Sequence, residues 1–423
     1  MRNKFIIAPS GKKVLEYDLL QLSNNIRVVH KFMPHTKIAH CGFMLDIGTR
    51  DETIDVAGIA HFWEHMAFKG TEKRKAFHII NRLESVGGEL NAYTTKDKIC
   101  FYASFMEEHY EKAVELLADI TFNSIFPSKE IEKERGVILE EMSMYVDLPE
   151  EAVCDEFENI VFHKHPLGTN ILGTAASVKQ ISKKDFHDFI HQHLDTSKIV
   201  FSSVGNIAVE KVNYFAQKYF GQVPAKSSTY KRKLFKTYKP KTVEVVKPFS
   251  QSHVVVGRDA YHVFHKDRLK LFMIVNLLGG PGMNSRLNLA LREKHGLVYN
   301  VEASYTSFTD TGLLEIYCGT EKKHLPKVHE IILAELKKMR ELPLGTMQLS
   351  SYKSQLIGQL AMAEESNVSL MQMMGKSILD MDNIESLEDI FYKISNITAR
   401  QLQEVANDIF EEKQLSYLTY KSE

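Results

Sequence analysis

Short apolar runs alternate with turn residues along the first third of the chain and predict strands and helices in mixed order. Two β-branched or apolar runs within residues 26–48, separated by Pro34-His35-Thr36, predict a β-hairpin. Apolar side chains recur at helical spacing over residues 56–68, with Asp55 as the N-cap and Gly70 as the stop. Further helices are predicted near 75–85, 107–122 and 128–146, and further strands near 89–94 and 98–105. This order predicts an α+β fold with a mostly antiparallel sheet.

A basic stretch at residues 223–248 interrupts this pattern. It holds eight Lys or Arg residues against one Glu, together with three prolines. Such a composition is typical of a solvated linker; the alternative, a polyanion-binding patch, is disfavoured because regularly spaced aromatic residues are missing. We therefore predict an N-terminal domain over residues 1–222, a linker over 223–248 and a C-terminal domain over 249–423.

The two halves of the chain resemble each other weakly. A predicted strand pair and helix that begin at Gly88 are echoed by a similar order that begins at Gly296. The offset of about 210 residues is much longer than the repeat of a solenoid. It favours a duplicated domain, and the alternative is two unrelated α+β domains that share a common local pattern.

The composition is that of an ordinary globular protein. Lys and Arg number 53 against 54 Asp and Glu, and 44% of the residues are hydrophobic. A net charge near zero gives no overall field that would gather nucleic acid or an anionic membrane, so we expect neither as a partner. At about 150 residues per domain, the length predicts more than one domain.

The cysteines and apolar segments predict a cytoplasmic protein. The apolar run near the N-terminus stops before Pro9, which is too short for a signal peptide, and residues 269–278 are too few to cross a membrane. Four cysteines lie far apart, as reduced thiols of an intracellular protein do: Cys41, Cys100, Cys154 and Cys318.

A candidate metal site lies on the helix predicted over residues 56–68. His61, Glu64 and His65 form the pattern H-x-x-E-H. A spacing of four residues puts both imidazoles on one helix face, about one turn apart and near enough to bind one metal ion. Glu64 lies beside them as a candidate general base, and a catalytic zinc site then needs a third protein ligand.

The third ligand is expected in the acidic run that ends at Glu141. Glu134 and Glu141 are two helical turns apart, so they share one face of the helix predicted over 128–146. One of them would bind the metal while the other supports the site from outside the ligand set. The alternative is an acidic helix surface that is merely solvated.

These motifs resemble the inverzincin peptidases of family M16, the group of pitrilysin, insulin-degrading enzyme and mitochondrial processing peptidase. The likeness joins the segment from His61 to Thr71 with Glu134 and Glu141, and it extends over nearly the whole chain. In the second half it includes the glycine-rich residues 279–287 and the segment 292–299. The length, with one metal motif, is similar to the shorter, processing-peptidase-like branch.

The resemblance implies one Zn²⁺ per chain and a role for each motif residue. His61, His65 and Glu141 would bind the zinc. Glu64 would be the general base, and Glu134 would orient the site.

The resemblance also implies residues that contact the substrate. Arg292 and Tyr299 would stabilise the oxyanion that forms on the substrate carbonyl. The substrate would lie as an added β-strand along Leu90, Asn91, Ala92 and Tyr93.

The family fold implies two homologous α+β domains that form half of a clamshell, so a second chain is expected to complete it. Because this chain holds both the metal motif and the Arg292/Tyr299 pair, we expect a homodimer, with a heterodimer of related chains as the alternative. The expected substrates are peptides or unfolded polypeptide segments.

Two other functions compete with the zinc endopeptidase. One is a noncatalytic or partner-dependent subunit of a related peptidase assembly, which the intact motif positions disfavour. The other is a structural zinc site, which is disfavoured because such sites use four closed ligands, usually with cysteine, and no cysteine is near the motif.

Overall fold

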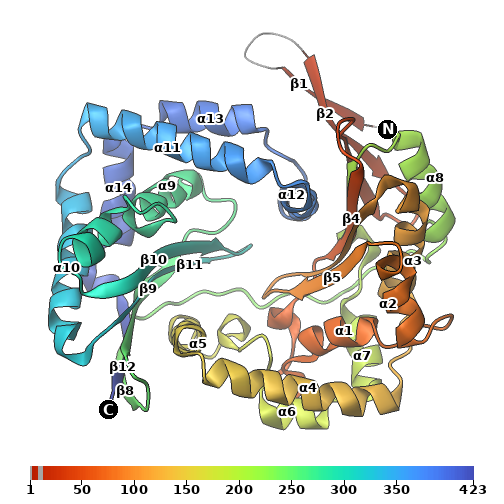
Figure 1. The fold of residues 1–423 in the computed structure, drawn as a ribbon, viewed down its shortest axis with the longest axis horizontal. Helices are drawn as coiled ribbons and strands as arrows, with labels where there is room; N and C mark the ends of the chain where they lie inside the picture. The colour runs from red at the N-terminus through yellow and green to blue at the C-terminus, as the bar shows by residue number, and fades with distance from the viewer. Residues whose placement is uncertain (1, 8–12) are drawn as a thin grey trace. The chain divides into compact units, whose positions relative to one another are not determined.

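The computed structural model describes residues 2–7 and 13–423, with side chains from Tyr17 onward. The chain divides into two compact units, each made of three segments and each containing one β-sheet (Figure 1). The first unit comprises the chain up to Met142 with Thr169–Arg232 and Ala361–Glu388. The second comprises Ser143–Gly168, Lys233–Leu360 and Asp389–Glu423.

The first unit is built on a sheet with the order β1-β2-β3-β7-β4-β6-β5. Its strands are β1 (Arg2–Ile7), β2 (Lys13–Gln21), β3 (Arg27–Phe32), β4 (Ile38–Leu45), β5 (Glu89–Thr94), β6 (Ile99–Met106) and β7 (Ile199–Gly205). Neighbouring strands are antiparallel except for the parallel pair of β3 and β7. Strand β5 therefore forms one edge of the described sheet.

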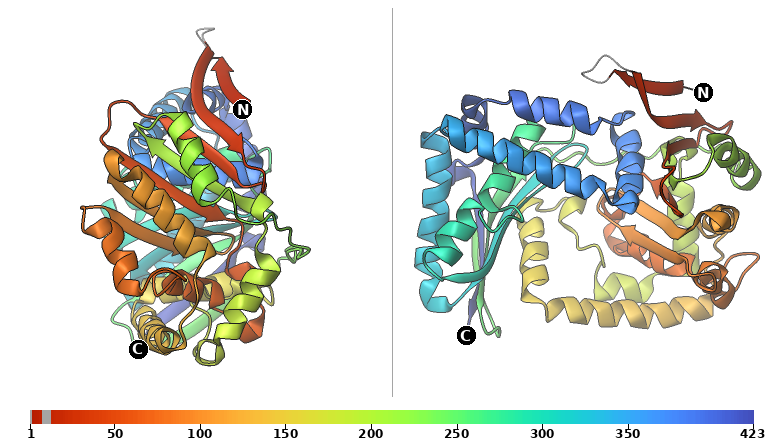
Figure 2. Two further views of the ribbon diagram at one scale, coloured as in Figure 1. Left: turned by 90° about the vertical axis from the view of Figure 1, so that its right-hand side faces the viewer. Right: turned by 45° about the horizontal axis from the view of Figure 1, so that its top comes forward.

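Helices cover both faces of this first sheet. One face carries α1 (Ile59–Ala67), α2 (Ala76–Glu84), α3 (Tyr110–Phe122) and α8 (Val209–Tyr219). Helices α3 and α8 lie in front of the strands in the left view of Figure 2. The opposite face carries α12 (Asn367–Met381), a helix from the second half of the chain. The remaining helices of this region are α4 (Ser128–Val146), α6 (Ala175–Gln180) and α7 (Lys183–His193).

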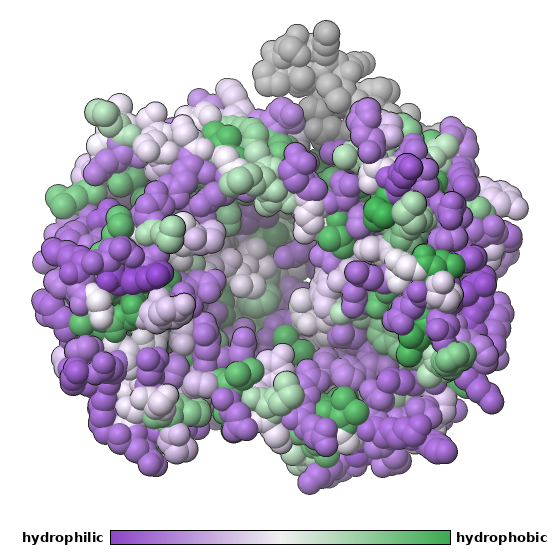
Figure 3. All heavy atoms as spheres, viewed as in Figure 1, coloured by the Kyte–Doolittle hydropathy of each residue, from purple (hydrophilic) through white to green (hydrophobic). Residues whose placement is uncertain are grey.

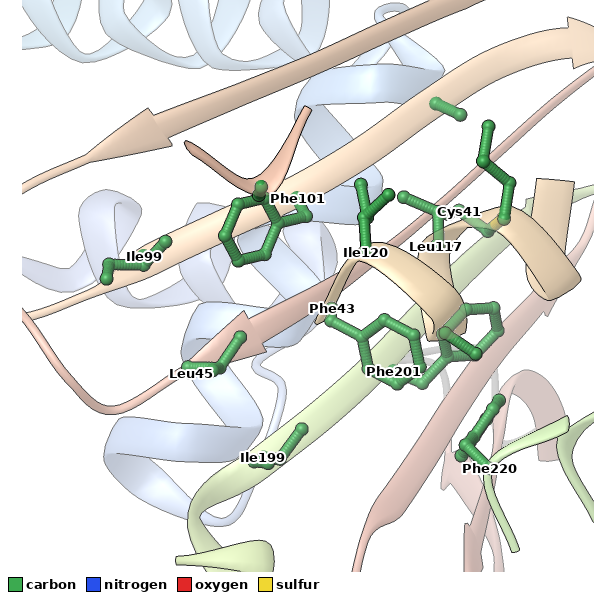
Figure 4. Packing of buried hydrophobic residues seen from close by; sticks show 14 of the residues in the cluster. Cys41, Phe43, Leu45, Ile99, Phe101, Leu117, Ile120, Ile199, Phe201 and Phe220 are labelled. Atoms are coloured by element: carbon green, nitrogen blue, oxygen red, sulfur yellow. The ribbon is translucent and has the colours of Figure 1, made fainter. Parts of the chain in front are cut away.

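The core under α3 is built from alternate residues of the central strands. Phe43 of β4, Phe101 of β6 and Phe201 of β7 are fully buried and lie on the same side of the sheet (Figure 4). Leu117 and Ile120 of α3 pack against them. Because side chains alternate between the two faces of a strand, each of these strands contributes every second residue to this core.

The second unit contains a sheet with the order β10-β11-β9-β12-β8. Its strands are β8 (Thr242–Lys247), β9 (Ser252–Ala260), β10 (Val298–Ser307), β11 (Gly312–Thr320) and β12 (Ser416–Ser422). Its helices are α5 (Pro149–Val161), α9 (Arg268–Gly279), α10 (Leu325–Glu341), α11 (Thr346–Glu364), α13 (Leu387–Asn396) and α14 (Ala399–Ile409). Helix α5, from the first half of the chain, packs on the face opposite α9 and α10.

The two sheets share one topology. The order β3-β7-β4-β6-β5 in the first unit corresponds to β8-β12-β9-β11-β10 in the second, and in both the first two strands are the parallel pair. The first sheet has β1 and β2 in addition. The predicted α+β fold, with two homologous domains and mostly antiparallel sheets, is confirmed.

Three local predictions need correction. The hairpin predicted over residues 26–48 is wrong, because β7 lies between β3 and β4 and pairs with both. The first helix begins at Ile59 and not near residue 56, because Gly58 adopts a left-handed φ of 92° that a helix cannot continue through. The last part of the predicted linker, residues 242–247, forms strand β8.

No helix in the described part of the chain is long and apolar enough to cross a bilayer. Hydrophilic residues cover most of the face drawn in Figure 3, and hydrophobic residues are scattered over it in small groups.

Candidate metal and catalytic site

Helix α1 is held at its first turn by a buried carboxylate. The backbone N–H groups of Gly58 and Ala60 donate to Glu52 Oε2 and Oε1 at 2.7 and 2.8 Å. The first N–H groups of a helix have no partner within the helix, so Glu52 supplies the missing acceptors. The apolar face of α1 is fully buried against the core: Ile59, Phe62, Trp63 and Met66. This packing fixes the direction in which the polar face of α1 points.

Three predicted ligands come together between α1 and α4. Ligand atoms of His61, His65 and Glu141 all lie within 4.8 Å of one another. Glu141 Oε2 is 3.8 Å from His61 Nε2 and 3.7 Å from His65 Nε2. Two donors on tetrahedral zinc with bonds of about 2.1 Å are separated by about 3.4 Å, so these distances fit one ion with little adjustment.

The protonation state of His61 also fits a metal. Burial, helped by the neighbouring His65, lowers the pKa of His61 to about 3, which keeps that imidazole neutral. Its Nδ1 atom is buried without a hydrogen-bond partner among the described residues. A neutral imidazole and a carboxylate are donors that Zn²⁺ accepts.

Glu134 supports His65 from the side away from Glu141. Glu134 Oε2 lies 3.2 Å from His65 Nδ1, and its other oxygen is 2.7 Å from the ammonium of Lys69. Glu134 is buried, at 7% exposure, and the Lys69 ammonium is the cation that faces its carboxylate. A carboxylate on Nδ1 leaves Nε2 as the atom of His65 that faces Glu141.

Glu64 lies on the same helix, beside the two histidines. Its Oε2 accepts a hydrogen bond from the Thr94 hydroxyl at 2.6 Å. Burial raises the pKa of Glu64, while the Thr94 hydrogen bond and the nearby His65 oppose that shift. A carboxylate with a raised pKa holds a proton more readily, as a general base must.

Arg292 and Tyr299 lie next to each other in the second unit. Arg292 is in a π-helical turn, Asn288–Glu293, and its guanidinium carbon is 5.7 Å from the centre of the Tyr299 ring. The Arg292 side chain is 42% exposed and Tyr299 is 83% exposed. Both groups are therefore open to solvent in the chain as described.

The predicted substrate residues all lie on edge strand β5. Leu90 and Ala92 pack against the core under α1, whereas Tyr93 points to the other face, where its ring is 6.2 Å from that of Tyr102. The backbone of Asn91 is paired with β6 on one side only. An unpaired strand edge is the element to which a peptide can add.

Sequence reasoning missed three residues that touch this site: Glu52, Lys69 and Thr94. Thr94 had a readable signal, because it follows Leu90 and Ala92 at a spacing of two and so shares their strand face. Glu52 and Lys69 act through contacts that depend on the folded loops, which no local spacing encodes.

Two family models match successive parts of the chain. Residues 27–175 match the family model described as insulinase, peptidase family M16. Residues 180–356 match the model described as the peptidase M16 inactive domain.

Similar proteins cover nearly the whole chain. An uncharacterised zinc protease of Bacillus subtilis is 32% identical over 92% of this chain and 94% of its own length. An uncharacterised zinc protease of Rickettsia felis is 31% identical over 93% of this chain and 95% of its own.

Solved structures share the fold. A crystal structure described as a peptidase M16 inactive domain from Pseudomonas fluorescens has a TM-score of 0.90 at 17% identity, covering 97% of this chain and 99% of the other. A protease from Helicobacter pylori has a TM-score of 0.86 at 22% identity, covering 96% and 99%.

Proposed function

This chain belongs to the M16 family of peptidases, and from that premise we propose that it is a zinc-dependent endopeptidase that hydrolyses peptides or unfolded polypeptide segments. The observation that carries the proposal is the convergence of His61, His65 and Glu141, with Glu64 beside them. Relatives of similar length are named zinc proteases, which supports zinc as the metal.

His61, His65 and Glu141 would hold one Zn²⁺ per chain. When bound, zinc supplies Lewis-acid polarisation of a water molecule and of the substrate carbonyl. The chain itself supplies two imidazoles and one carboxyl group, and Glu134 contacts His65 Nδ1, which orients that ring for binding. Three protein ligands leave a position open for water, as catalytic sites require.

Glu64 would act as the general base and then as the general acid. It takes a proton from the attacking water as the new C–O bond forms at the scissile carbonyl. It then gives that proton to the leaving nitrogen as the C–N bond breaks. The partly buried position of Glu64 supports both steps, because burial favours the protonated form between them.

Arg292 and Tyr299 would donate hydrogen bonds to the oxyanion. The exposed guanidinium and phenol are both donors, and the contact between them holds them side by side. Donors aimed at developing negative charge lower the barrier to acyl transfer. The substrate would add to the edge of β5, over Leu90, Asn91, Ala92 and Tyr93.

We further propose a homodimer in which Arg292 and Tyr299 of one subunit act at the metal site of the partner subunit. Mixing His65→Ala with Arg292→Ala protein tests this arrangement. Recovery of activity would support a site shared between subunits, whereas no recovery would point to a self-contained site or to a different, related partner chain. The four free thiols support a reducing, cytoplasmic compartment.

The proposed function is tested by metal content and peptide cleavage together. Purified protein is expected to contain one zinc per chain, to cleave an internally quenched peptide, and to lose cleavage on chelation and regain it with added zinc. Bound zinc with no cleavage of any peptide, alone or with a related chain, would favour a noncatalytic subunit instead.

A further inference from the structure

The hydroxyl of Thr94 makes the shortest described contact to the general base. Thr94 Oγ1 donates to Glu64 Oε2 at 2.6 Å. Thr94 is the last residue of β5 and lies on the strand face that Leu90 and Ala92 turn toward α1. The hydrogen bond therefore joins the metal-site helix to the proposed substrate strand at one point.

We propose that Thr94 is a positioning residue for the general base: its hydroxyl fixes Glu64 Oε2, so that Oε1 alone faces the attacking water. The inference rests on the proposed function and deepens it. A glutamate carboxylate rotates easily about its last bond, because that torsion has a broad, two-fold energy profile. One hydrogen bond to a fixed donor removes this freedom before the substrate arrives.

The proton path follows from this arrangement. The water proton moves to Oε1, while Oε2 keeps the Thr94 hydrogen bond throughout. The same oxygen then returns the proton to the leaving nitrogen, so no rotation of the carboxylate is needed between the two transfers. Thr94 itself neither gains nor loses a proton.

The position of Thr94 is fixed by the turn that follows it. The backbone N–H of Thr49 donates to Thr95 O at 3.1 Å, and that of Arg50 donates to Lys96 O at 2.9 Å. These bonds attach the β5–β6 turn to the loop that leads into α1. The donor strand and the acceptor helix are thus anchored to the same short segment of chain.

Buried ion pairs lock this junction. Arg50, at 2% exposure, contacts Asp97 of the turn at 3.0 Å. Arg232 donates to the carboxylate of Asp51 at 2.8 Å and to the backbone oxygen of Asp97 at 2.8 Å. Lys98 contacts Asp380 of α12 at 2.5 Å. Buried charges that are fully paired resist displacement, because separating any pair leaves an uncompensated charge.

The helix side of the contact is held from the same segment. Glu52, directly after Asp51, accepts the first N–H groups of α1. Residues 49–52 therefore position both partners of the Thr94–Glu64 hydrogen bond. Because the Thr94 hydroxyl is held in place in this way, we expect it to fix the orientation of the Glu64 carboxylate.

Replacement of Thr94 by valine tests the inference, because valine keeps the shape and strand preference but removes the hydroxyl. We expect Thr94→Val to lower kcat about 10- to 100-fold, the range for losing a hydrogen bond to a charged group, with KM unchanged. Thr94→Ser, which keeps the hydroxyl, is expected to stay within about 3-fold of the wild type.

Three further measurements separate positioning from folding. Zinc content, the thermal unfolding midpoint and the affinity of the metal-free protein for the peptide are expected to match the wild type in Thr94→Val. The matched control is Thr121→Val in α3, since the buried Thr121 hydroxyl has no hydrogen-bond partner among the described residues. This control is expected to leave kcat unchanged.

Several results would overturn the inference. One is a wild-type kcat in Thr94→Val, and another is a kcat in Thr94→Ser as low as that in Thr94→Val. A third is a fall in the activity of Thr94→Val that is explained by lost zinc or by weaker peptide binding. Turnover by the wild type decides the proposed function separately. A zinc-loaded wild type that cleaves no peptide would overturn that function, and the role of Thr94 with it.

Discussion

Helices α1 and α9 occupy the same place in the two repeats, yet only α1 carries reactive groups. In the order of the chain, α1 follows β4 and precedes β5, and α9 follows β9 and precedes β10. These strands correspond to each other in the two sheets. Helix α1 presents two histidines and a glutamate on its polar face, whereas α9 contains no histidine, aspartate or glutamate. The same scaffold thus supports a candidate metal site in one copy and a plain core helix in the other.

The candidate site groups of the two units also differ in burial. Around α1, arginines and aspartates are buried and paired, and Glu134 and His61 are each less than 10% exposed. In the second unit, Arg292 and Tyr299 are open to solvent. Substitutions of the buried, paired charges around α1 should therefore change stability, whereas substitutions of the exposed pair should change activity alone.

The largest effect is expected from Glu64→Gln. The amide cannot accept the water proton, so kcat should fall about 10³- to 10⁴-fold, the upper range for losing a general base. Zinc content should be unchanged, because Glu64 is not among the three converging ligands. Peptide cleavage and metal analysis on the same preparation check both parts.

The matched control for this variant is Glu140→Gln. Glu140 is exposed on α4, next to Glu141 in sequence but off the face that meets α1. It should keep full activity. Substantial turnover by Glu64→Gln would show that another group takes the proton, and would remove the main functional difference between α1 and α9.

A smaller loss, of folding stability, is expected from Arg232→Met. Arg232 lies between Asp46 at 2.7 Å and Asp51 at 2.8 Å, and its removal leaves a half-buried and a buried carboxylate with less compensating charge. We expect a loss of about 3 kcal/mol in the free energy of unfolding, measured in urea.

The exposed ion pair of Arg400 and Glu404 in the second unit provides the comparison. The Arg400 side chain is 87% exposed, so Arg400→Met should lower the free energy of unfolding by less than about 0.5 kcal/mol. Equal losses in the two variants would contradict the contrast in burial between the units.

Arg292→Ala tests whether the exposed pair takes part in catalysis at all. Loss of one oxyanion donor should lower kcat about 10²-fold, with the unfolding midpoint unchanged because the side chain is exposed and its charge is not buried in the core. Lys294→Ala, an exposed neighbour in the same turn, should have no effect. Wild-type activity in Arg292→Ala would confine the chemistry to the first unit.

Much of this organisation could be predicted because its signals are local. The i, i+4 spacing of His61 and His65 specifies a shared helix face, and the two-turn spacing of Glu134 and Glu141 does the same for α4. The contact between these two helix faces depends on the tertiary structure, which local spacing does not predict. The resemblance to known peptidases nevertheless implied that contact.

What could not be predicted depends on pairing between distant segments. Strand β7 inserts between β3 and β4 after more than 150 residues of intervening chain, so two adjacent runs that look like a hairpin do not pair. Helix α5 comes from the first half of the chain but packs on the second sheet, and α12 comes from the second half but packs on the first sheet. No local signal predicts this, because the pattern of a helix shows which of its faces is apolar but not which sheet that face covers.

The smallest expected effect concerns acid stability. Burial lowers the pKa of His30, which contacts Ser203 Oγ at 3.1 Å and the backbone oxygen of Ile207 at 2.8 Å. The folded protein therefore keeps His30 neutral while the unfolded chain takes up a proton below about pH 6.5. The stability that neutral His30 provides is present above pH 6.5 and is lost as pH falls toward its lowered folded pKa.

His30→Gln removes this proton uptake, so its free energy of unfolding should fall less steeply between pH 7 and pH 5 than that of the wild type. The difference in slope can reach at most about 1.4 kcal/mol per pH unit, the value for one proton. His163→Gln, at an exposed position, should keep the wild-type slope. Because His253 in the second sheet also has a pKa lowered by burial, part of the acid sensitivity should persist in His30→Gln. Parallel curves for His30→Gln and the wild type would show that the buried histidine of the first sheet does not contribute, and would leave His253 as the buried strand histidine to test next.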